Sequence, residues 1–122
     1  MDEAVWRALE NDLVIDITTT GRKTGRPRRK EIWFHNVAGQ LYLTGSPGRR
    51  GWYANLRANP EFTFHLKRTT RVDLPARATP ILDKARRREI LQKIHQRFEG
   101  RRWNLDAWVE GSTLVQVEIL AS

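Results

Sequence analysis

Apolar and polar residues alternate along much of this chain in the pattern of short strands. Ile15, Ile17 and the three threonines after them favour a strand over residues 13–20, because β-branched residues prefer extended backbone. The same criterion predicts strands over residues 31–37, 40–44, 61–67, 71–79 and 114–120. Gly39 is placed to turn the second strand into the third as a hairpin. Pro75 favours a sheet edge or a bulge for the strand at 71–79.

Three segments show the spacing of helices instead. An apolar stripe predicts a helix over residues 2–11, and a short helix over residues 52–58 is stopped by Asn59-Pro60. A long helix is expected from Pro80 to about Phe98, with Thr79 as its cap and Gly100 as its end. About six antiparallel strands with one long helix before the last strand predict a mainly β fold, a small barrel with flanking helices, as a single domain over residues 1–122.

Composition narrows the chemistry. The 122 residues include no cysteine and three scattered histidines, which argues against a disulfide framework and against a metal site. We expect a cytoplasmic location, since no stretch resembles a signal peptide or a membrane span. The net charge of +8 favours an anionic partner, whether nucleic acid, a membrane surface or a phosphorylated cofactor.

The positive charge is concentrated in two segments. Residues 21–30, GRKTGRPRRK, hold six basic side chains, two glycines and no acidic residue, which suits a loop that wraps an anion. Taken alone, such a loop is more often a solvated turn or a nucleic-acid contact. The second segment, residues 84–102, is most simply a solvated helix surface, with peripheral contact to an anionic membrane or to an acidic partner as a minor alternative.

The aromatic and histidine residues also lead to expectations. Trp33 and Phe34 are neighbours in a strand, so one belongs to the core and only the other can face a ligand. We expect His35 at the surface or in a satisfied hydrogen bond. The other tryptophans outside the short helix, Trp6, Trp103 and Trp108, are expected to be packing anchors.

Three blocks, taken together and in order, resemble a known family. They are TTTGRKTGR at residues 18–26, EIWF at residues 31–34 and WYANLRANP at residues 52–60. In sequence and spacing they resemble the deazaflavin-dependent nitroreductase family of split β-barrel oxidoreductases. The resemblance covers about residues 13–80, and the closing helix and strand fit the same outline.

The resemblance implies a cofactor and a set of site residues. Such proteins are related to the FMN-binding split barrels and carry the 8-hydroxy-5-deazaflavin coenzyme F420. The family's loop holds the phosphate and acidic tail of the coenzyme, and another segment lies beside the ring. The matching residues here are Arg22, Lys23, Thr24 and Arg26 in the loop, Thr44, Gly45 and Ser46 beside the ring, and Trp52, Tyr53 and Asn55 in the supporting helix. The stretch from Ser46 to Trp52 is shorter than in many members, which keeps FMN as the alternative cofactor.

Two classes of function follow. The first is an oxidoreductase that transfers hydride from the deazaflavin to a small-molecule acceptor such as a quinone, an enone or a nitro compound. The cofactor then carries the chemistry, and Tyr53 is the candidate proton donor, with packing beneath the ring as the equal alternative. The second is a basic nucleic-acid-binding module. We expect no nucleic acid, because the basic loop and the WY pair are separate blocks on either side of a hairpin. A homodimer is left open.

Overall fold

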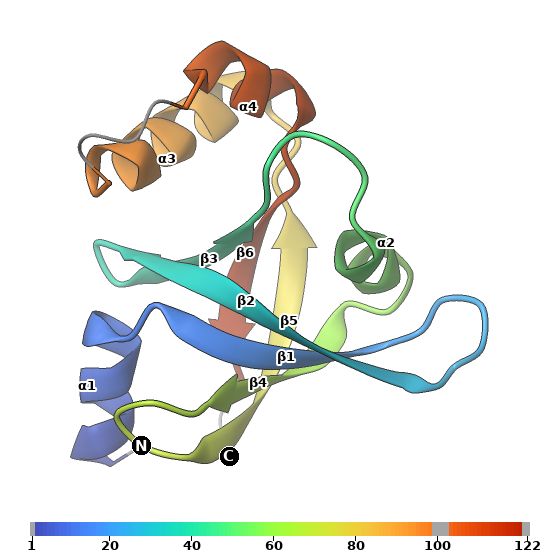
Figure 1. Cartoon of the computed structure of the whole chain (residues 1–122), viewed down its shortest axis with the longest axis vertical. Coiled ribbons are helices and arrows are strands. Elements are labelled where there is room, and N and C mark those ends of the chain that lie inside the picture. The colour runs from blue at the N-terminus through green and yellow to red at the C-terminus, as the bar shows by residue number, and fades with distance from the viewer. Residues whose placement is uncertain (1, 99–102, 121–122) are drawn as a thin grey trace.

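A computed structural model describes residues 2–98 and 103–120 of the chain. Six antiparallel strands close into a barrel in the order β1-β2-β3-β6-β5-β4 (Figure 1). The strands are β1 (Val14–Thr20), β2 (Pro27–Val37), β3 (Gln40–Thr44), β4 (Glu61–Leu66), β5 (Val72–Pro80) and β6 (Leu114–Ile119). The predicted number and direction of the strands are confirmed.

Alternation along the strands fills the barrel. In β1 the side chains of Ile15, Ile17 and Thr19 are buried, while the residues between them are half-buried. Phe34 and Phe64 meet edge to face inside, with ring centroids 5.2 Å apart. Gly39, at φ 88°, makes the tight hairpin between β2 and β3 as expected.

Pro75 does not lie at a sheet edge. β5 pairs with β4 on one side and with β6 on the other, so the barrel leaves it no open edge. Pro75 is nevertheless tolerated, because it pairs with Thr63 of β4 just beyond the last paired residue of β6. There its carbonyl accepts the Leu120 amide at 2.8 Å, and the missing N–H costs one terminal hydrogen bond.

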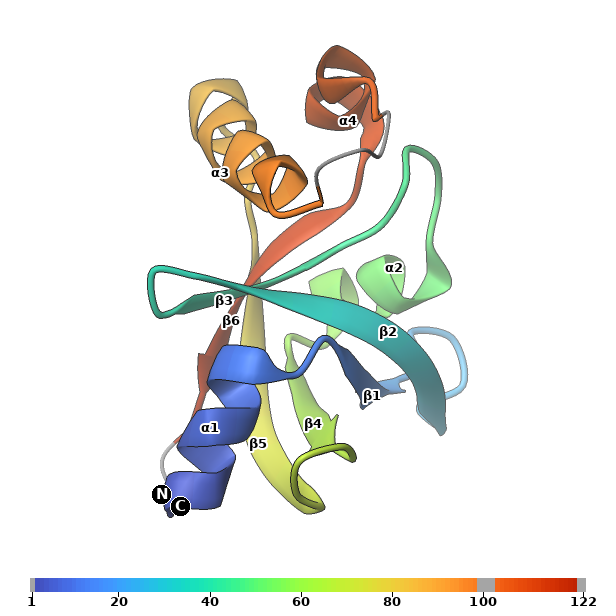
Figure 2. The ribbon, with the colours of Figure 1, turned by 60° about the vertical axis from the view of Figure 1, so that its left-hand side comes forward.

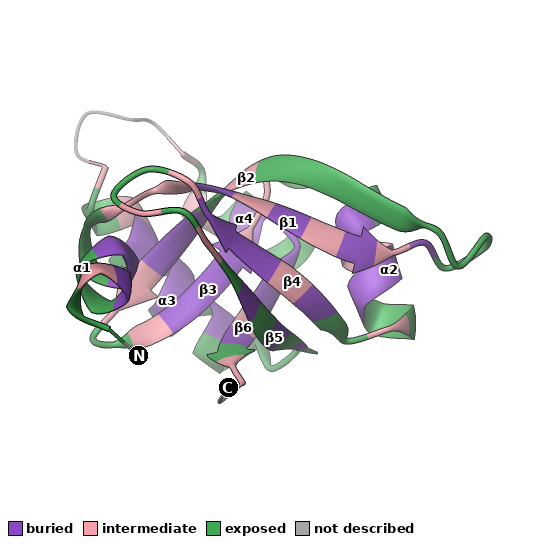
Figure 3. Cartoon of the chain, turned by 90° about the horizontal axis from the view of Figure 1, so that it is seen from below, coloured by how far each residue is buried: buried purple, intermediate pink, exposed green. Residues whose placement is uncertain are grey.

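The basic segment is only partly a loop. β2 begins at Pro27, so residues 27–30 extend the strand and the turn covers residues 21–26. The expected loop through Lys30 is therefore wrong at its end. Residues 27–31 are all exposed (Figure 3), so no alternation of apolar and polar side chains marks this part of the strand in the sequence.

Four helices flank the barrel: α1 (Glu3–Asn11), α2 (Gly51–Ala58), α3 (Lys84–Gln96) and α4 (Leu105–Gly111). The first two match their predictions. The third begins later than expected, because Asp83 caps it by accepting the Arg86 amide at 2.9 Å. Pro80 instead ends β5 opposite Val115, since the fixed φ of proline suits a strand end as well as a helix start. The predicted stop at Gly100 lies outside the described residues.

α4 was not predicted. Its seven residues, LDAWVEG, make less than two full turns, too few for a helical period to stand out. α3 and α4 lie together at one end of the barrel (Figures 1 and 2) and share a second core with Tyr42 of β3 and Leu114 of β6. Trp108 belongs to this core and Trp103 packs against it, as expected. Trp6 does not serve as an anchor, because it is 54% exposed on α1. None of the described helices combines the length and apolarity needed to cross a membrane.

Candidate functional site

The loop between β1 and β2 is closed by its own backbone. The Gly21 amide donates to the Arg26 carbonyl at 2.8 Å, and the Gly25 amide donates to the Gly21 carbonyl at 2.8 Å. Gly25 has φ 70°, a conformation that favours glycine. The Thr24 hydroxyl accepts the Arg26 amide at 3.2 Å. Glycine and threonine therefore shape a tight turn in which Arg22 and Lys23 are exposed.

Asn55 of α2 holds this loop in place. Its Oδ1 accepts the Arg22 amide at 3.1 Å and Arg22 Nη1 at 3.0 Å. Its Nδ2 donates to Thr19 Oγ1 at 3.1 Å. Asn55 is buried, so its amide serves as a support that joins the loop, α2 and β1.

The loop, β2 and α2 surround a cationic pocket of about 520 Å³. Lys23, Arg28 and Lys30 line it and form no ion pair with an acidic side chain in the part of the chain that the structure describes. The full lining is Ile17, Thr19, Gly21, Arg22, Lys23, Thr24, Arg28, Arg29, Lys30, Gly51, Trp52 and Asn55. Five of the predicted cofactor residues, Arg22, Lys23, Thr24, Trp52 and Asn55, thus meet in one place.

The start of α2 adds to the positive potential of this pocket. Gly51 and Trp52, the first two residues of the helix, are part of the lining. The N-cap residue Arg50 makes no side-chain capping bond, and the first turn has no acidic residue. Helix N-termini carry unsatisfied N–H groups and a partial positive charge. The pocket therefore suits an anion of the size of a phosphate group.

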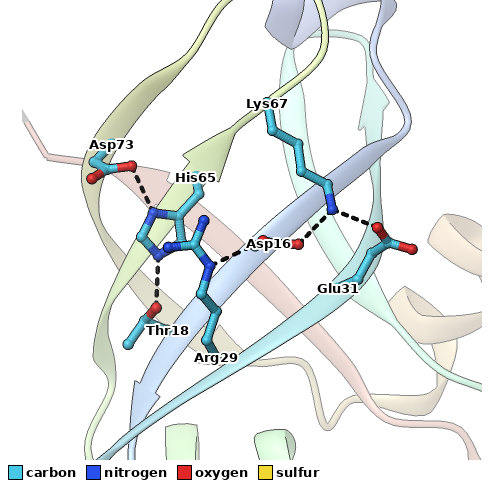
Figure 4. Close-up of polar contacts among 7 residues, drawn as sticks. All are labelled: Asp16, Thr18, Arg29, Glu31, His65, Lys67 and Asp73. Carbon is cyan, nitrogen blue, oxygen red and sulfur yellow. Dashed lines mark hydrogen bonds and ion pairs between the residues drawn. The ribbon is translucent and has the colours of Figure 1, made fainter.

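Two cations of the basic segment have other partners, although Arg29 is also part of the pocket lining. Arg29 directs its Nε to Asp16 at 3.0 Å on the outer face of the barrel, where Lys67 also binds Asp16 at 2.7 Å (Figure 4). The hydrogen bond from Lys67, followed by that from Arg29, holds the pKa of Asp16 below its usual value. Arg26 contributes its backbone to the turn and does not line the cationic pocket.

Thr44, Gly45 and Ser46 line a separate aromatic hollow of about 280 Å³. Its other lining residues are Trp33, His35, Ile94, Trp103 and Trp108, so it lies between β2 and β3 on one side and α3 and α4 on the other. Thr44 Oγ1 donates to the Thr113 carbonyl at 2.6 Å. A Cβ on Gly45 would come within 3.1 Å of Thr113 Oγ1. Thr44 and Gly45 are thus packed tightly against Thr113, the residue that precedes β6.

The aromatic hollow settles the expectations for residues 33–35. Phe34 is fully buried in the barrel, while Trp33 is 38% exposed and stacks on Phe98 with centroids 5.7 Å apart. The expectation that one of the two residues belongs to the core is confirmed, and Trp33 is the one left to face a ligand. His35, however, is 4% exposed, and its Nδ1 has no hydrogen-bond partner among the described residues. Burial, with the charges of Arg97 and His95, lowers the pKa of His35 to about 4. The expected surface or satisfied histidine is wrong, because α3 covers this face.

Tyr53 is placed in neither hollow. It lines a smaller cavity of about 220 Å³ together with Arg87 and Leu82. Its ring meets Trp52 edge to face at 6.1 Å, and the Arg57 guanidinium lies 5.9 Å from its centroid. A direct part for Tyr53 in catalysis stays a prediction.

The sequence reading did not identify Ile17, Thr19, Lys30 and Gly51 as lining residues. The β1–β2 register pairs Ile17 with Lys30 and Thr19 with Arg28, so the side chains of Ile17, Thr19, Arg28 and Lys30 share the inner face. Recognising them from sequence required the extension of β2 back to Pro27, which the run of polar residues hides.

Solved structures share this fold at low sequence identity. A conserved hypothetical protein from Mycobacterium tuberculosis matches with a TM-score of 0.75 and 18% identity, over 98% of this chain and 81% of that one. An F420 reductase matches with a TM-score of 0.71 and 21% identity, over 99% and 97%. A FAD-binding protein from Mesorhizobium loti matches with a TM-score of 0.65 and 16% identity, over 99% and 91%.

A family model gives the functional assignment that these structures do not. The model for F420H(2)-dependent quinone reductase matches residues 3–109, which include every lining residue of the cationic pocket and of the aromatic hollow. The predicted deazaflavin dependence and oxidoreductase class are thereby confirmed. The chain belongs to the F420H(2)-dependent quinone reductase family.

Proposed function

We propose that the chain holds the phosphate end of coenzyme F420 in the cationic pocket and reduces a quinone in or beside the aromatic hollow. The observation that carries the proposal is the group of cations around the uncapped start of α2. Lys23, Arg28 and Lys30 have no ion-pair partner among the described side chains, and Gly51 opens the helix beside them. These residues fit a phosphodiester, which takes charged hydrogen bonds and backbone N–H groups.

The two hollows are linked by one stretch of chain. Thr44 to Ser46 line the aromatic hollow, and Gly51 and Trp52, a few residues later, line the cationic pocket. An elongated coenzyme with a flat ring at one end and a phosphate further along fits a path along this stretch. Reduced deazaflavin supplies hydride when it is bound, and the chain's own residues orient it and exclude water.

The walls of the aromatic hollow suit a flat, apolar acceptor. Trp33, Trp103 and Trp108 offer ring faces and edges for stacking. His35 is uncharged at neutral pH because its pKa is about 4, so the hollow carries no imidazolium charge. Both features favour a quinone over a charged substrate.

A binding titration followed by fluorescence tests the cofactor site. Coenzyme F420 should bind more tightly than FMN, and added salt should weaken it because several charges are neutralised. Arg28→Ala should weaken F420 binding, whereas Arg88→Ala, which removes an exposed cation of α3 paired with Asp106, should leave it unchanged. Tight FMN binding without F420 binding would overturn the site assignment, and displacement of F420 by single-stranded DNA would favour the nucleic-acid alternative.

Steady-state kinetics test the acceptor site separately. Trp33→Ala should raise KM for a soluble naphthoquinone and leave the Kd of F420 unchanged, because Trp33 lines the aromatic hollow and not the cationic pocket. An unchanged KM would place the acceptor elsewhere.

A further inference from the structure

Three neighbouring strands bring a threonine, a histidine and an aspartate together on the outer face of the barrel. Thr18 of β1 shares this face with Asp16, two residues earlier. His65 of β4 is a diagonal neighbour of Thr18, because Thr18 pairs with Thr63. His65 in turn pairs directly with Asp73 of β5. The three side chains form a row across β1, β4 and β5 (Figure 4).

Two short hydrogen bonds join this row. Thr18 Oγ1 lies 2.7 Å from His65 Nε2, and His65 Nδ1 lies 2.7 Å from Asp73 Oδ1. Because a carboxylate only accepts hydrogen bonds, Asp73 holds the proton of the neutral imidazole on Nδ1. Nε2 then carries the lone pair and accepts the hydrogen bond of the Thr18 hydroxyl. A hydroxyl, an imidazole and a carboxylate in this order are what activates a hydroxyl nucleophile in hydrolases.

The threonine of the row lines a groove, while the histidine is shielded from solvent. His65 is 6% exposed, whereas Thr18 is half-buried and lines a groove of about 430 Å³. Of the residues that line this groove, only Thr19 also lines the cationic pocket. A molecule in the groove would therefore lie beside Thr18 without occupying the proposed cofactor site.

The lining indicates which molecules the groove suits. Thr18, Thr20 and Thr63 give it small polar walls. Glu61 is the only charged residue among the described ones that line it, and it pairs with Arg77 at 3.5 Å. The groove has no cation of its own in its lining, so it favours a small uncharged molecule over an anion.

A guanidinium lies beside the threonine. Arg29 of β2 is directly opposite Thr18 in the β1–β2 ladder, where side chains on one face are neighbours. Arg29 binds Asp16 through its Nε at 3.0 Å. A guanidinium has five N–H donors, so Arg29 can also stabilise negative charge on an acyl oxygen next to Thr18.

We propose that Thr18 is the nucleophile of a second activity, the hydrolysis of small uncharged carboxylic esters. Thr18 Oγ1 bonds to the acyl carbon while His65 takes the hydroxyl proton. The ester C–O bond then breaks, and His65 returns the proton to the leaving alcohol. Water attacks the acyl-threonine with His65 as base, which releases the carboxylic acid and restores the hydroxyl. Asp73 is a positioning residue that fixes the imidazole. No hydride is transferred, so this activity is independent of the proposed reduction of a quinone.

The uncharged ester 4-nitrophenyl acetate tests the proposal with the full chain and no added coenzyme. The protein should release nitrophenolate, and mass spectrometry after an acid quench should find an acetyl group on Thr18. Thr18→Val removes the hydroxyl, keeps the branched shape, and should lower the rate of release by about a hundredfold. Thr79→Val, at an exposed threonine of β5 outside the groove, should leave the rate unchanged. An unchanged rate in folded Thr18→Val protein would overturn the proposal and leave the row as a structural contact.

Variants of the other two residues separate catalysis from packing. His65→Gln can still form hydrogen bonds but has no basic nitrogen, so it should also lose the acetylation of Thr18. Asp73→Asn should lower kcat by about tenfold or more at an unchanged KM and unfolding midpoint, because an amide no longer fixes the Nδ1 proton. A change in the midpoint alone would make Asp73 purely structural. If Thr18→Val does not fold, the acetyl map of the wild-type chain decides, since acetyl groups on lysines alone would overturn the proposal.

Discussion

Asn55 Oδ1 accepts two hydrogen bonds from Arg22, one from its backbone amide at 3.1 Å and one from its guanidinium at 3.0 Å. The conformation of the basic loop is therefore set by a side chain 33 residues further along the chain. Since Asn55 lies on α2, whose first residues also line the cationic pocket, the loop and the helix are positioned as one unit.

Asn55→Ala should lower the free energy of unfolding by about 1–3 kcal/mol and weaken F420 binding as well, because the Arg22 amide loses its partner. Urea unfolding and a fluorescence titration measure the two effects. Thr19→Val is the matched control, since it removes only the hydroxyl that Asn55 Nδ2 binds and leaves the contact with Arg22. Wild-type affinity in Asn55→Ala would show that the loop does not need this anchor.

Lys23→Ala should weaken F420 binding by about 1–3 kcal/mol without changing the unfolding midpoint, because Lys23 is exposed and its charge faces the cationic pocket. Lys93→Ala is the control, as Lys93 lies on α3 and pairs with Glu89. If Lys23→Ala and Arg22→Ala together left the Kd unchanged, Arg49 and Arg50 would become the candidates for the phosphate.

Arg87→Met should lower the free energy of unfolding by about 3 kcal/mol or more, because it leaves several buried carbonyls without a donor. Arg87 is 7% exposed, and its guanidinium donates to the carbonyls of Ile81, Trp108, Val109 and Ser112 at 2.7–3.2 Å. Arg88→Ala, next in sequence but exposed, should cost less than about 1 kcal/mol. Equal losses in urea unfolding would contradict the structural role of Arg87.

The free energy of unfolding should fall as the pH drops from 6.5 to about 4. The first value is the ordinary pKa of histidine, and the second is the pKa of His35 in the folded protein. In this window the unfolded chain binds the proton that folded His35 does not, so acid favours unfolding by up to about 3 kcal/mol. Burial lowers the pKa of His95 too, which adds to the same trend. The pKa of Asp16 lies below its ordinary value of 3.8, so protonation of Asp16 affects stability only at pH values below this window. His35→Leu should flatten the curve of unfolding free energy against pH, and an unchanged slope would assign the trend to other groups.

Tyr53→Phe should keep near-normal turnover with a quinone, because Tyr53 lines neither the cationic pocket nor the aromatic hollow. Its ring packs on Trp52, and phenylalanine keeps that contact. Steady-state kinetics with F420 affinity as the control measure the effect. A loss of about a hundredfold in kcat with an unchanged Kd for F420 would instead indicate that the Tyr53 hydroxyl is a proton donor.

The sequence was most informative where one face of an element is buried. Ile15, Ile17, Phe62 and Phe64 alternate with polar neighbours, and their strands were placed within a residue of the observed bounds. The sequence was least informative for the start of β2, residues 27–31, where neither face is buried and Arg28 resembles a loop residue as much as a strand residue.

Long-range contacts explain the other differences. The resemblance in sequence identified five of the residues that line the cationic pocket, because the motifs that carry it include Arg22, Lys23, Thr24, Trp52 and Asn55 themselves. The division into a cationic pocket and an aromatic hollow depends on α3 and α4, which cover His35 and bring Trp108 beside Ser46. α4 was not predicted, so its side of the aromatic hollow could not be predicted either. Arg87 was included in a solvated basic face for the same reason, since it is α4 that buries it.

The cations of α3 and those that line the cationic pocket differ in how far their charge reaches. On α3, Lys84, Arg88 and Lys93 each have an acidic neighbour within 3.3 Å, so their fields largely cancel a short distance from the surface. Around the cationic pocket Lys23, Arg28 and Lys30 have no such neighbour in the described chain, and their fields add. These unneutralised cations therefore add to the attraction that a chain with a net charge of +8 exerts on an anion. A multiply charged coenzyme that diffuses past should be steered phosphate-first, so salt should slow its association more than it speeds its release.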